Sequence, residues 1–261
     1  MFWLCVIFKK YYCFPDINIL FCIKQTNLLN MNAIITGATK GIGKAIALKL
    51  AKKGYNLAIC ARTKSDLIAL TDELQKHGIE VYSMVADCSV KEEVLAFCNF
   101  VRESLPNIDV LVNNAGVFLP GSMLDEADET FELQQSLNIN STYYLSKYVG
   151  KIMRTQKKGH IFNICSVASI MVIENAGSYS VTKAAMLSLN NVLRAELAPY
   201  NVKVTAILPG STLTASWEGT NLPQEQFIQP EDVANSLSAI LDLSSGANVD
   251  ELILKPLNFK I

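Results

Sequence analysis

Three residues of this chain could together move a proton at a carbonyl group. Tyr179 and Lys183 are four residues apart, and Ser166 lies upstream of both. Residues four apart on a helix share one face. A lysine ammonium near a phenol favours the phenolate form, which makes the tyrosine usable as a proton donor or acceptor. A serine hydroxyl can hydrogen-bond the oxygen of a carbonyl. Because Tyr-x-x-x-Lys alone is a common helical pair, this interpretation depends on the rest of the chain.

A glycine-rich segment near residue 40 could hold phosphates. An apolar run at residues 33–36 predicts a strand, and Gly37, Gly41 and Gly43 follow it. An amphipathic stretch at residues 44–53 then predicts a helix. Strand, glycine-rich turn and helix form the context of a dinucleotide site, in which helix N–H groups face the pyrophosphate. The spacing is Gly-x-x-x-Gly-x-Gly, and a plain glycine-rich turn is the alternative.

The elements that must position these residues alternate along the chain. We expect strands at 33–36, 56–60, 80–85, 109–112, 159–164, 202–208 and 252–254, and helices at 44–53, 65–77, 91–105, 128–155, 179–200 and 230–241. Buried strands between helices predict an α/β fold, a single doubly wound Rossmann-type domain with a mainly parallel seven-stranded sheet and helices on both faces. Ligands bind beyond the carboxyl ends of such strands. Gly37, Asp87, Asn113, Ser166 and Pro209 all follow predicted strand ends, so we expect them at one edge.

Composition excludes several other classes of protein. The 261 residues are 50% hydrophobic and carry a formal net charge of -1, which gives no indication of a nucleic-acid surface. The 7 cysteines show no Cys-x-x-Cys spacing, and the 2 histidines are His77 and His160. We therefore expect no metal site, and we expect free thiols in a reducing cytoplasm.

Residues 1–30 do not fit the alternating pattern. Their apolar runs are shorter than the ~20 residues that a membrane helix needs. The pair Lys9 and Lys10 follows the first apolar run, whereas a secretory signal places basic residues before it. We expect a non-native extension, with translation starting at Met31 and the domain spanning 31–261. A hydrophobic arm that packs on a partner subunit or a membrane surface is the alternative.

From Met31 to the C-terminus the chain resembles the short-chain dehydrogenase/reductase family. The matching motifs are Thr36 to Gly43, Asp87, Asn113 to Gly116, Asn138, Ser166, Tyr179 with Lys183, and Pro209 with Gly210. Their order along the chain is the order in the family. The resemblance implies hydride transfer between a nicotinamide and a carbonyl or alcohol.

The resemblance assigns catalytic roles to four residues. Tyr179 would be the general acid, and Lys183 would support it and hold the nicotinamide ribose. Ser166 would orient the carbonyl oxygen. Asn138 would hold a water of a proton relay; Asn140 competes for this role, but the spacing to the serine favours Asn138.

The resemblance also implies a set of cofactor contacts. Asp87 would contact the adenine, whereas Asn113 would stabilise the central sheet. Thr214, or alternatively Thr212, would reach the nicotinamide carboxamide. The full set is Gly37, Thr39, Lys40, Gly41, Ile42, Gly43, Arg62, Asp87, Asn114, Ala115, Gly116, Tyr179, Lys183, Pro209, Gly210, Thr212 and Thr214.

The residues after the second strand favour NADP(H) over NAD(H). A carboxylate there would bind the ribose 2′-hydroxyl of NAD, whereas an arginine accommodates a 2′-phosphate. The chain has Arg62 at this point and no acid before Asp66, and Lys40 adds a second cation. Arginine binds phosphate through paired, charge-assisted hydrogen bonds.

Three functions remain open. The first is NADPH-dependent reduction of a small ketone or aldehyde, with residues 167–178 and 211–229 setting substrate choice. The second is a 3-oxoacyl-acyl-carrier-protein reductase; the C-terminus lacks that group's glycine pair and is more like NADP-dependent 3-hydroxy-acid dehydrogenases and sepiapterin-reductase-like proteins. The third is a non-catalytic NADP(H) sensor or scaffold. The family also implies a homodimer or homotetramer joined through helices 128–155 and 179–200.

Overall fold

The computed structural model describes residues 31–257 except 218 and 220. The expectation for residues 1–30 lies outside the described residues. The described part holds a 7-stranded sheet in the order β3-β2-β1-β4-β5-β6-β7. Every neighbouring pair is parallel, so the predicted sheet is confirmed and is wholly parallel rather than mainly so. The strands are β1 (Asn32–Thr36), β2 (Asn56–Ala61), β3 (Val81–Val85), β4 (Val110–Asn113), β5 (Gly159–Ile164), β6 (Val202–Pro209) and β7 (Glu251–Leu254).

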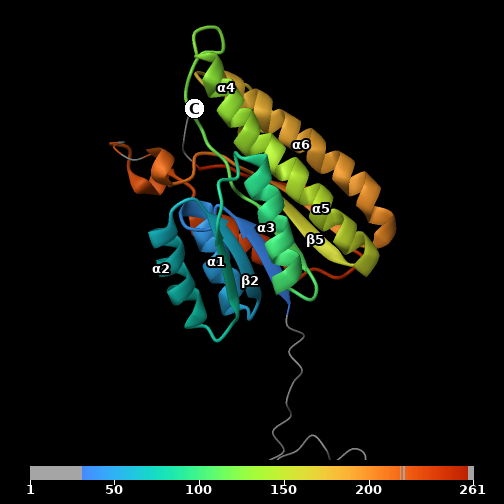
Figure 1. Cartoon of the computed structure of the whole chain (residues 1–261). Helices are drawn as coiled ribbons and strands as arrows, with labels where there is room; N and C mark the ends of the chain where they lie inside the picture. Colours follow the sequence, from blue (N-terminus) through green and yellow to red (C-terminus); the bar gives the residue numbers. More distant parts are fainter. Residues whose placement is uncertain (1–30, 218, 220, 258–261) are drawn as a thin grey trace, which may run out of the picture. The chain divides into compact units, whose positions relative to one another are not determined.

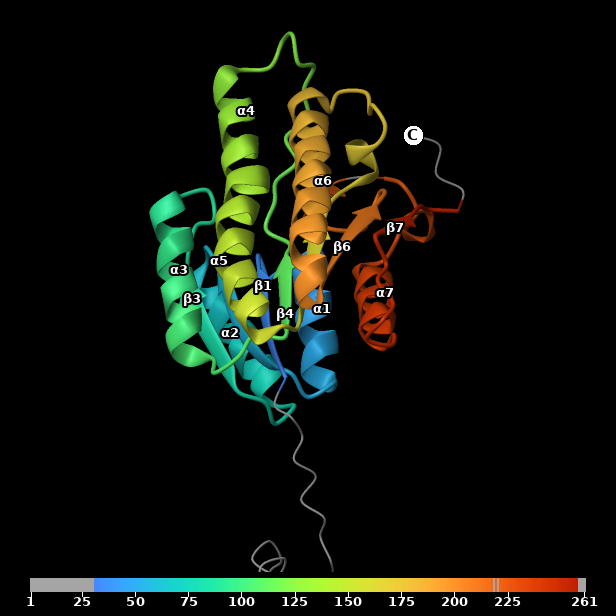
Figure 2. The same cartoon turned by 90° about the vertical axis from the view of Figure 1, so that its right-hand side faces the viewer.

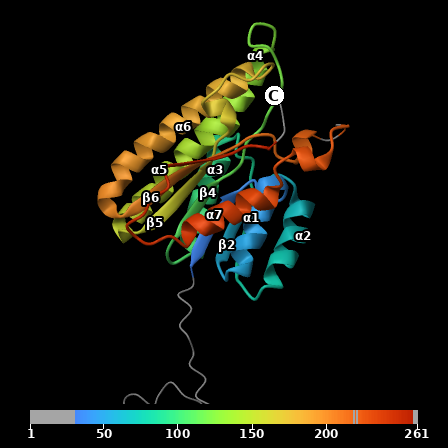
Figure 3. The same cartoon turned by 180° about the vertical axis from the view of Figure 1, so that it is seen from behind.

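Helices cover both faces of the sheet (Figures 1 and 3). Helices α1 (Gly41–Lys52), α2 (Lys64–Gln75) and α7 (Pro230–Leu241) pack on one face. Helices α3 (Lys91–Ser104) and α5 (Ser141–Gln156) pack on the other, where α6 (Gly177–Leu197) also lies (Figure 2).

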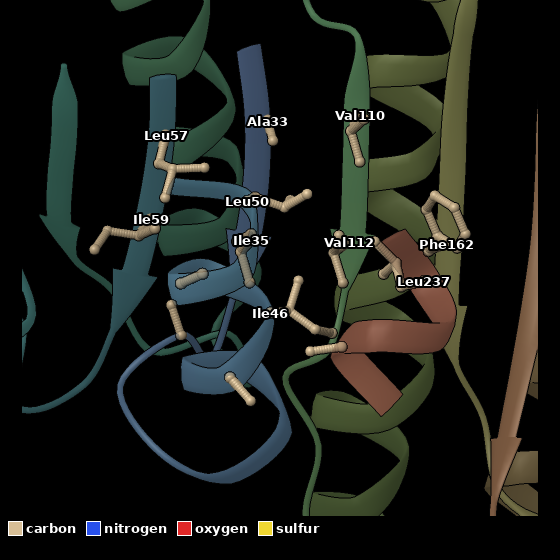
Figure 4. Packing of buried hydrophobic residues seen from close by; sticks show 14 of the residues in the cluster. Ala33, Ile35, Ile46, Leu50, Leu57, Ile59, Val110, Val112, Phe162 and Leu237 are labelled. Carbon is tan, nitrogen blue, oxygen red and sulfur yellow. The ribbon is translucent and has the colours of Figure 1, made fainter. Parts of the chain in front are cut away.

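The central strands are apolar on both sides because both sheet faces are covered. In β1, Ile35 faces the α1 side together with Leu50 of α1 and Leu237 of α7 (Figure 4). The preceding residue, Ile34, faces the α3 side, where it joins Phe97. All of these side chains are fully buried. Burial of an isoleucine or leucine contributes about 1.5–3 kcal/mol, so these strands form a stiff base for the loops at their ends.

The predicted helix at 128–155 is one long helix with an unusual turn. Helix α4 (Asp128–Gln134) passes into a π-helical turn at Gln135–Asn140 and continues as α5. A π-turn widens the helix and re-aims its side chains, and such turns are frequent at functional sites. Asn138 lies within this turn.

The bounds of helices α1 and α6 differ from the predicted ranges. Helix α1 begins at Gly41 rather than at residue 44, so the glycine turn leads directly into it. Helix α6 begins at Gly177 and its α-helical part ends at Leu197, followed by a 3-10 turn at Ala198–Tyr200. Pro199 lies in that turn, and proline cannot donate the hydrogen bond that would continue an α-helix.

A buried polar chain ties the centre of the sheet to the helices on one face. Asn113 Nδ2 donates to Ser146 Oγ and to Asn163 Oδ1, each at 2.8 Å. Asn163 Nδ2 donates in turn to Asn190 Oδ1 of α6 at 2.9 Å. Because all four side chains are buried and paired, they fix β4 and β5 against α5 and α6. This position agrees with the sheet-stabilising role expected of Asn113.

Candidate active site

One cleft of about 800 Å³ lies at the carboxyl edge of the sheet. Residues following each of the strands β1 to β6 line it. The predicted site residues among them are Gly37, Thr39, Lys40, Gly41, Ile42, Arg62, Asn114, Ala115, Gly116, Ser166, Tyr179, Lys183, Pro209, Gly210, Thr212 and Thr214. Gly43, Asp87 and Asn138 were also predicted at the site and do not line this cleft.

The cleft spans several strands, and its two ends take their residues from different strands. We call the part lined by Lys40, Arg62 and Asp66 the β2 end, and the part lined by Phe118, Ser166, Glu174 and Tyr179 the β5 end. In the sheet order, β2 and β5 are three strand intervals apart. At about 4.8 Å per interval the two ends are separated by about 14 Å, a span that suits an extended ligand.

The glycine-rich turn brings backbone close to the cleft. Gly37 and Gly41 have positive φ values of 62° and 50°, which favour glycine. A Cβ on Gly43 would lie 2.3 Å from the carbonyl oxygen of Gly37, so this glycine serves packing of α1 against the turn. The N-cap residue of α1, Lys40, gives no side-chain hydrogen bond to the first turn, and no acidic residue lies there. The helix N-terminus is therefore suited to an external anion.

Asn114 and Thr36 hold the turn in place. Asn114 Nδ2 donates to the backbone oxygens of Thr36 at 2.9 Å and Gly37 at 3.0 Å. Thr36 Oγ1 accepts from the backbone N–H groups of Asn114 and Ala115. The Asn114 side chain thus joins the end of β4 to the end of β1, and its amide N–H groups are used in hydrogen bonds within the protein. The role of Thr36 was not predicted individually; its place at the last position of β1 was the available signal.

Cations dominate the β2 end. Arg62 is exposed directly after β2, and Lys40 projects from the glycine turn. Lys40 Nζ lies 3.5 Å from Asp66 Oδ2, and its side chain is 72% exposed. An exposed ion pair of this kind contributes about 0–1 kcal/mol, so Lys40 can exchange Asp66 for a bound phosphate at little cost.

Asp87 turns back toward its own loop. Its Oδ1 accepts from the backbone N–H of Ser89 at 2.8 Å and from Ser89 Oγ at 2.7 Å. The next residue, Cys88, lines the cleft instead. Cys88 Sγ lies 3.8 Å from Cys60 Sγ, and this contact together with burial raises the pKa of the Cys60 thiol.

Lys183 is a buried ammonium beside the Tyr179 ring. Its Nζ donates to the backbone oxygen of Ile164 at 2.9 Å and lies 5.7 Å from the centre of the tyrosine ring. Lys183 is 5% exposed, and a buried charge is tolerated only when it is hydrogen-bonded or paired. The end of β5 thus supplies an acceptor that holds the lysine next to the phenol.

Ser166 retains a hydrogen to donate. Its Oγ accepts from the backbone N–H of Ala168 at 3.1 Å, which caps a short 3-10 turn at Val167–Ser169. The hydroxyl oxygen is used as an acceptor there, so its own hydrogen is available to an oxygen in the cleft. The neighbouring thiol of Cys165 is inert by comparison, because burial raises its pKa to about 12.

Asn138, rather than Asn140, contacts the groups around Lys183. Asn138 Oδ1 accepts from the backbone N–H of Val117 at 2.8 Å, and its Nδ2 donates to Thr182 Oγ1 at 3.0 Å. A Cβ on Gly116 would lie 3.1 Å from Asn138 Oδ1 and 3.6 Å from Lys183 Nζ, which brings these three residues together. Asn138 therefore lies behind the cleft wall. The π-turn that aims it has no recognisable sequence signal.

The loop after β6 closes over the glycine turn. Thr212 Oγ1 donates to the backbone oxygen of Gly210 at 2.9 Å. Thr214 approaches Gly41, where a Cβ would lie 3.0 Å from Thr214 Cγ2. Both threonines line the cleft, so both alternatives for the nicotinamide carboxamide contact stay open.

Phe118 is a site residue that sequence reasoning missed. Its ring meets that of Tyr179 edge to face, with centroids 4.9 Å apart. Phe118 follows β4 by a few residues in a segment without regular structure, where no periodic pattern marks a wall residue. It limits the directions in which the phenol can turn.

Two other features are absent from the part of the chain that the structure describes. Its histidine, cysteine and acidic side chains form no group suited to a metal ion. Among the same residues, no helix combines the length and apolar character needed to cross a bilayer.

Comparison with known proteins identifies the family. The model of the short chain dehydrogenase family matches residues 31–225. An uncharacterized oxidoreductase of Staphylococcus aureus (strain MRSA252) is 31% identical over 232 residues, which cover 89% of this chain and 100% of that protein.

Solved structures agree with this match. The alcohol dehydrogenase of the archaeon Thermococcus sibiricus, complexed with 5-hydroxy-NADP, has a TM-score of 0.82 and 29% identity, with 88% of this chain and 98% of that chain covered. L-sorbose reductase from Gluconobacter frateurii, complexed with NADPH and L-sorbose, has a TM-score of 0.81 and 27% identity with the same coverage. With the motif residues gathered in one cleft, the family match means that this chain is a member of the short-chain dehydrogenase family of oxidoreductases.

Proposed function

We propose that this oxidoreductase uses NADPH to reduce the carbonyl group of a small ketone or aldehyde to an alcohol. The observation that carries the proposal is that one cleft is lined by both kinds of residue that the reaction needs. Its β5 end holds Ser166, Tyr179 and Lys183, and its β2 end holds cations beside an open helix N-terminus. Proton-transfer groups and a phosphate-binding turn about 14 Å apart fit a dinucleotide laid along the strand ends.

The residues at the β2 end fit NADP(H) rather than NAD(H). Arg62 and Lys40 can bind the 2′-phosphate, whereas the nearest carboxylate, Asp66, is paired with Lys40. The glycine turn fits the pyrophosphate, since Gly37 and Gly41 line the cleft with backbone alone, which allows a phosphate to approach closely. Both structural relatives described above were solved with an NADP compound, which agrees with this choice.

The protein's part in the reaction is to position the carbonyl and supply a proton. A nicotinamide cofactor bound in the cleft would supply the hydride to the carbonyl carbon. Tyr179 donates the phenolic proton to the oxygen as negative charge develops there, and the Lys183 ammonium stabilises the phenolate that remains. Ser166 donates its free hydroxyl hydrogen to the same oxygen. Asn138 holds the backbone of Val117 and the side chain of Thr182, and in this way maintains the wall from which a water relay can reach Lys183.

Two alternatives stay as lesser proposals. A 3-oxoacyl-acyl-carrier-protein reductase would use the same catalytic residues and differ in its substrate. A non-catalytic NADP(H) sensor or scaffold would need the fold alone. The accessible hydroxyl hydrogen of Ser166 and the buried ammonium beside Tyr179 favour an enzyme, because binding a nucleotide requires neither.

We also propose a cytoplasmic homodimer or homotetramer joined through the helices α4, α5 and α6. These helices expose apolar side chains, among them Phe131, Tyr143, Val181 and Val192. The described cysteines are buried free thiols, which suits a reducing compartment. Light scattering of the purified protein would measure the mass of the assembly.

A substrate panel tests the proposed reaction. The protein is mixed with NADPH and a set of small ketones, aldehydes and 3-oxoacyl thioesters, and the loss of NADPH absorbance is followed. We expect reduction of small carbonyl compounds by the wild type and loss of that activity in Tyr179→Phe. Binding of NADPH without turnover of any carbonyl compound would favour the sensor. Turnover confined to carrier-protein thioesters would favour the acyl reductase.

A further inference from the structure

One carboxylate of the cleft has no function in the proposed reaction. The cleft is lined by five charged residues among those described, namely Lys40, Arg62, Asp66, Glu174 and Lys183. Three of them belong to the β2 end, and Lys183 is buried beside Tyr179. Glu174 is the remaining charge, and it lies in the segment that joins Ser166 to Tyr179.

The backbone fixes Glu174 at the tip of a turn. The N–H of Ala176 donates to the backbone oxygen of Ile173 at 3.2 Å, which closes a turn with Glu174 and Asn175 at its centre. Asn175 has a φ of 53°, a left-handed conformation that asparagine tolerates better than most residues. The hydrogen bond and the left-handed residue together fix the backbone of the turn, and with it the place at which the Glu174 side chain begins.

A second segment clamps the same turn from outside. The N–H of Gly121 donates to the backbone oxygen of Asn175 at 2.8 Å, and the N–H of Gly177 donates to the oxygen of Gly121 at 3.2 Å. A Cβ on Gly177 would lie 2.7 Å from Met123 Cβ, so the two segments are in close contact. Glu174 is therefore held at the rim of the β5 end rather than on a loosely attached loop.

The Glu174 carboxylate is free to act on a ligand. It is exposed, and within the described residues it has no ion-pair partner. The ammonium of Lys183 donates to the backbone oxygen of Ile164 and lies beside the tyrosine ring. A substrate that carried a carboxylate would thus meet a like charge at the β5 end and find no free cation there among the lining residues.

We propose that Glu174 is a specificity-determining residue that makes the enzyme favour neutral or cationic carbonyl substrates over those bearing a carboxylate. The proposal rests on the proposed carbonyl reduction and narrows its substrate class. It disfavours 3-oxo acids, the class to which the resemblance to 3-hydroxy-acid dehydrogenases pointed. Hydroxylated or amino-bearing ketones can instead donate a hydrogen bond to the carboxylate.

The size of the effect follows from Coulomb's law. In low salt, two like charges about 8 Å apart change a binding or rate constant about 2-fold at the dielectric constant of water, and about 30-fold at the lower effective constant that applies near a protein surface. Salt of about 0.5 M screens most of this. A hydrophobic or steric preference would not change with salt in this way.

A matched set of substrates tests the proposal. Acetoacetate, its neutral methyl ester and the cation aminoacetone are small ketones that differ in charge. Their kcat/KM values are measured with NADPH in the wild type, in Glu174→Gln and in Glu174→Lys. We expect the ratio of ester to acid to fall about 2- to 30-fold in the glutamine variant and further in the lysine variant. The preference for aminoacetone should fall in the same order, and all these differences should shrink in high salt.

Controls separate this proposal from the reaction itself. Glu103→Gln is the matched control. It removes an exposed carboxylate near the end of α3, at the amino ends of the strands and away from the cleft, and should leave the substrate ratios unchanged. NADPH affinity, measured by fluorescence titration, should be equal in all variants. Reduction of the ketones with ratios that are identical in the three proteins would overturn the role of Glu174 while leaving the proposed function intact. If none of the ketones is reduced, the proposed function fails and this inference fails with it.

Discussion

The β2 end and the β5 end of the cleft are built in different ways. The β2 end consists of strand ends and the first turn of a helix, and much of its surface is backbone around Gly37 and Gly41. The β5 end combines one strand end with the helix α6 and with a loop clamped by Gly121. Backbone at strand ends follows from the fold, whereas loop side chains vary freely. This difference explains why a cofactor class can be proposed with fewer alternatives than a substrate.

The largest effect is expected from the β5 end. Replacing Tyr179 by phenylalanine removes the hydroxyl but keeps the ring that packs against Phe118. We expect kcat to fall about 10²–10⁴-fold, the usual contribution of a general acid. NADPH affinity should be nearly unchanged, because the hydroxyl is far from the cations of the β2 end. Steady-state kinetics and a fluorescence titration measure the two quantities. Near-normal turnover in this variant would remove Tyr179 from the reaction.

The next largest effect is expected from the β2 end. Arg62→Asp replaces the exposed cation after β2 with a carboxylate that can accept from ribose hydroxyls. A charge-assisted hydrogen bond contributes about 1.5–3 kcal/mol, so the ratio of kcat/KM for NADPH to that for NADH should fall about 10- to 150-fold. kcat with saturating cofactor should change little. An unchanged ratio would show that Arg62 is an ordinary surface cation.

Sequence reasoning predicted those parts of the cleft that depend on local signals, for a physical reason. Apolar strands and Gly41 are local signals, because a buried strand needs apolar residues and a left-handed turn needs glycine. The same holds for Tyr179 and Lys183, whose spacing is one helical turn. The sheet and the helix order could therefore be predicted before the structure.

Features that depend on contacts between distant segments could not be predicted. The π-turn around Asn138 follows from its fit against Val117 and Thr182, which are remote in the sequence. The Asp87 carboxylate accepts hydrogen bonds from Ser89 and does not point into the cleft. No sequence pattern distinguishes between these two orientations of the side chain. Glu174 is one acid among many until the turn that holds it is known.

A smaller effect tests whether the β2 end depends on close backbone packing. Gly43→Ala would place a methyl group 2.4 Å from Asn114 Nδ2 and 2.3 Å from the oxygen of Gly37. The turn must shift to admit it, and overpacking of this kind costs about 1–3 kcal/mol. We expect a lower melting temperature and weaker NADPH binding. Gly54→Ala is the matched control, because Gly54 has a positive φ and open space around it. Any loss of stability in that variant comes from backbone conformation alone, and NADPH affinity should be unchanged.

The smallest effect concerns the amino end of β5, the strand that leads to Ser166. His160 is buried there, with its Nε2 2.8 Å from Thr205 Oγ1. Because that hydroxyl donates to the backbone oxygen of Val249, the imidazole N–H is the donor to Thr205. Burial, and secondarily the charge of Lys203, lower the pKa of His160 from 6.5 to about 3.

This pKa determines the sign of a pH effect on stability. Between about pH 3 and 6.5 the unfolded chain binds a proton at this position that the folded chain does not, so acid favours unfolding. The stabilisation by the neutral His160 is complete above pH 6.5, and it is lost as the pH falls, by about 1.4 kcal/mol per pH unit.

Urea unfolding at pH 7.5 and pH 5.5 tests this effect. The free energy of unfolding of the wild type should be lower at pH 5.5. In His160→Gln, which keeps an N–H donor and cannot titrate, the decrease between the two pH values should be smaller by about 1.4 kcal/mol. An equal pH dependence in the wild type and in His160→Gln would mean that the acid sensitivity arises from other groups, and that the buried imidazole does not determine how the stability of β5 changes with pH.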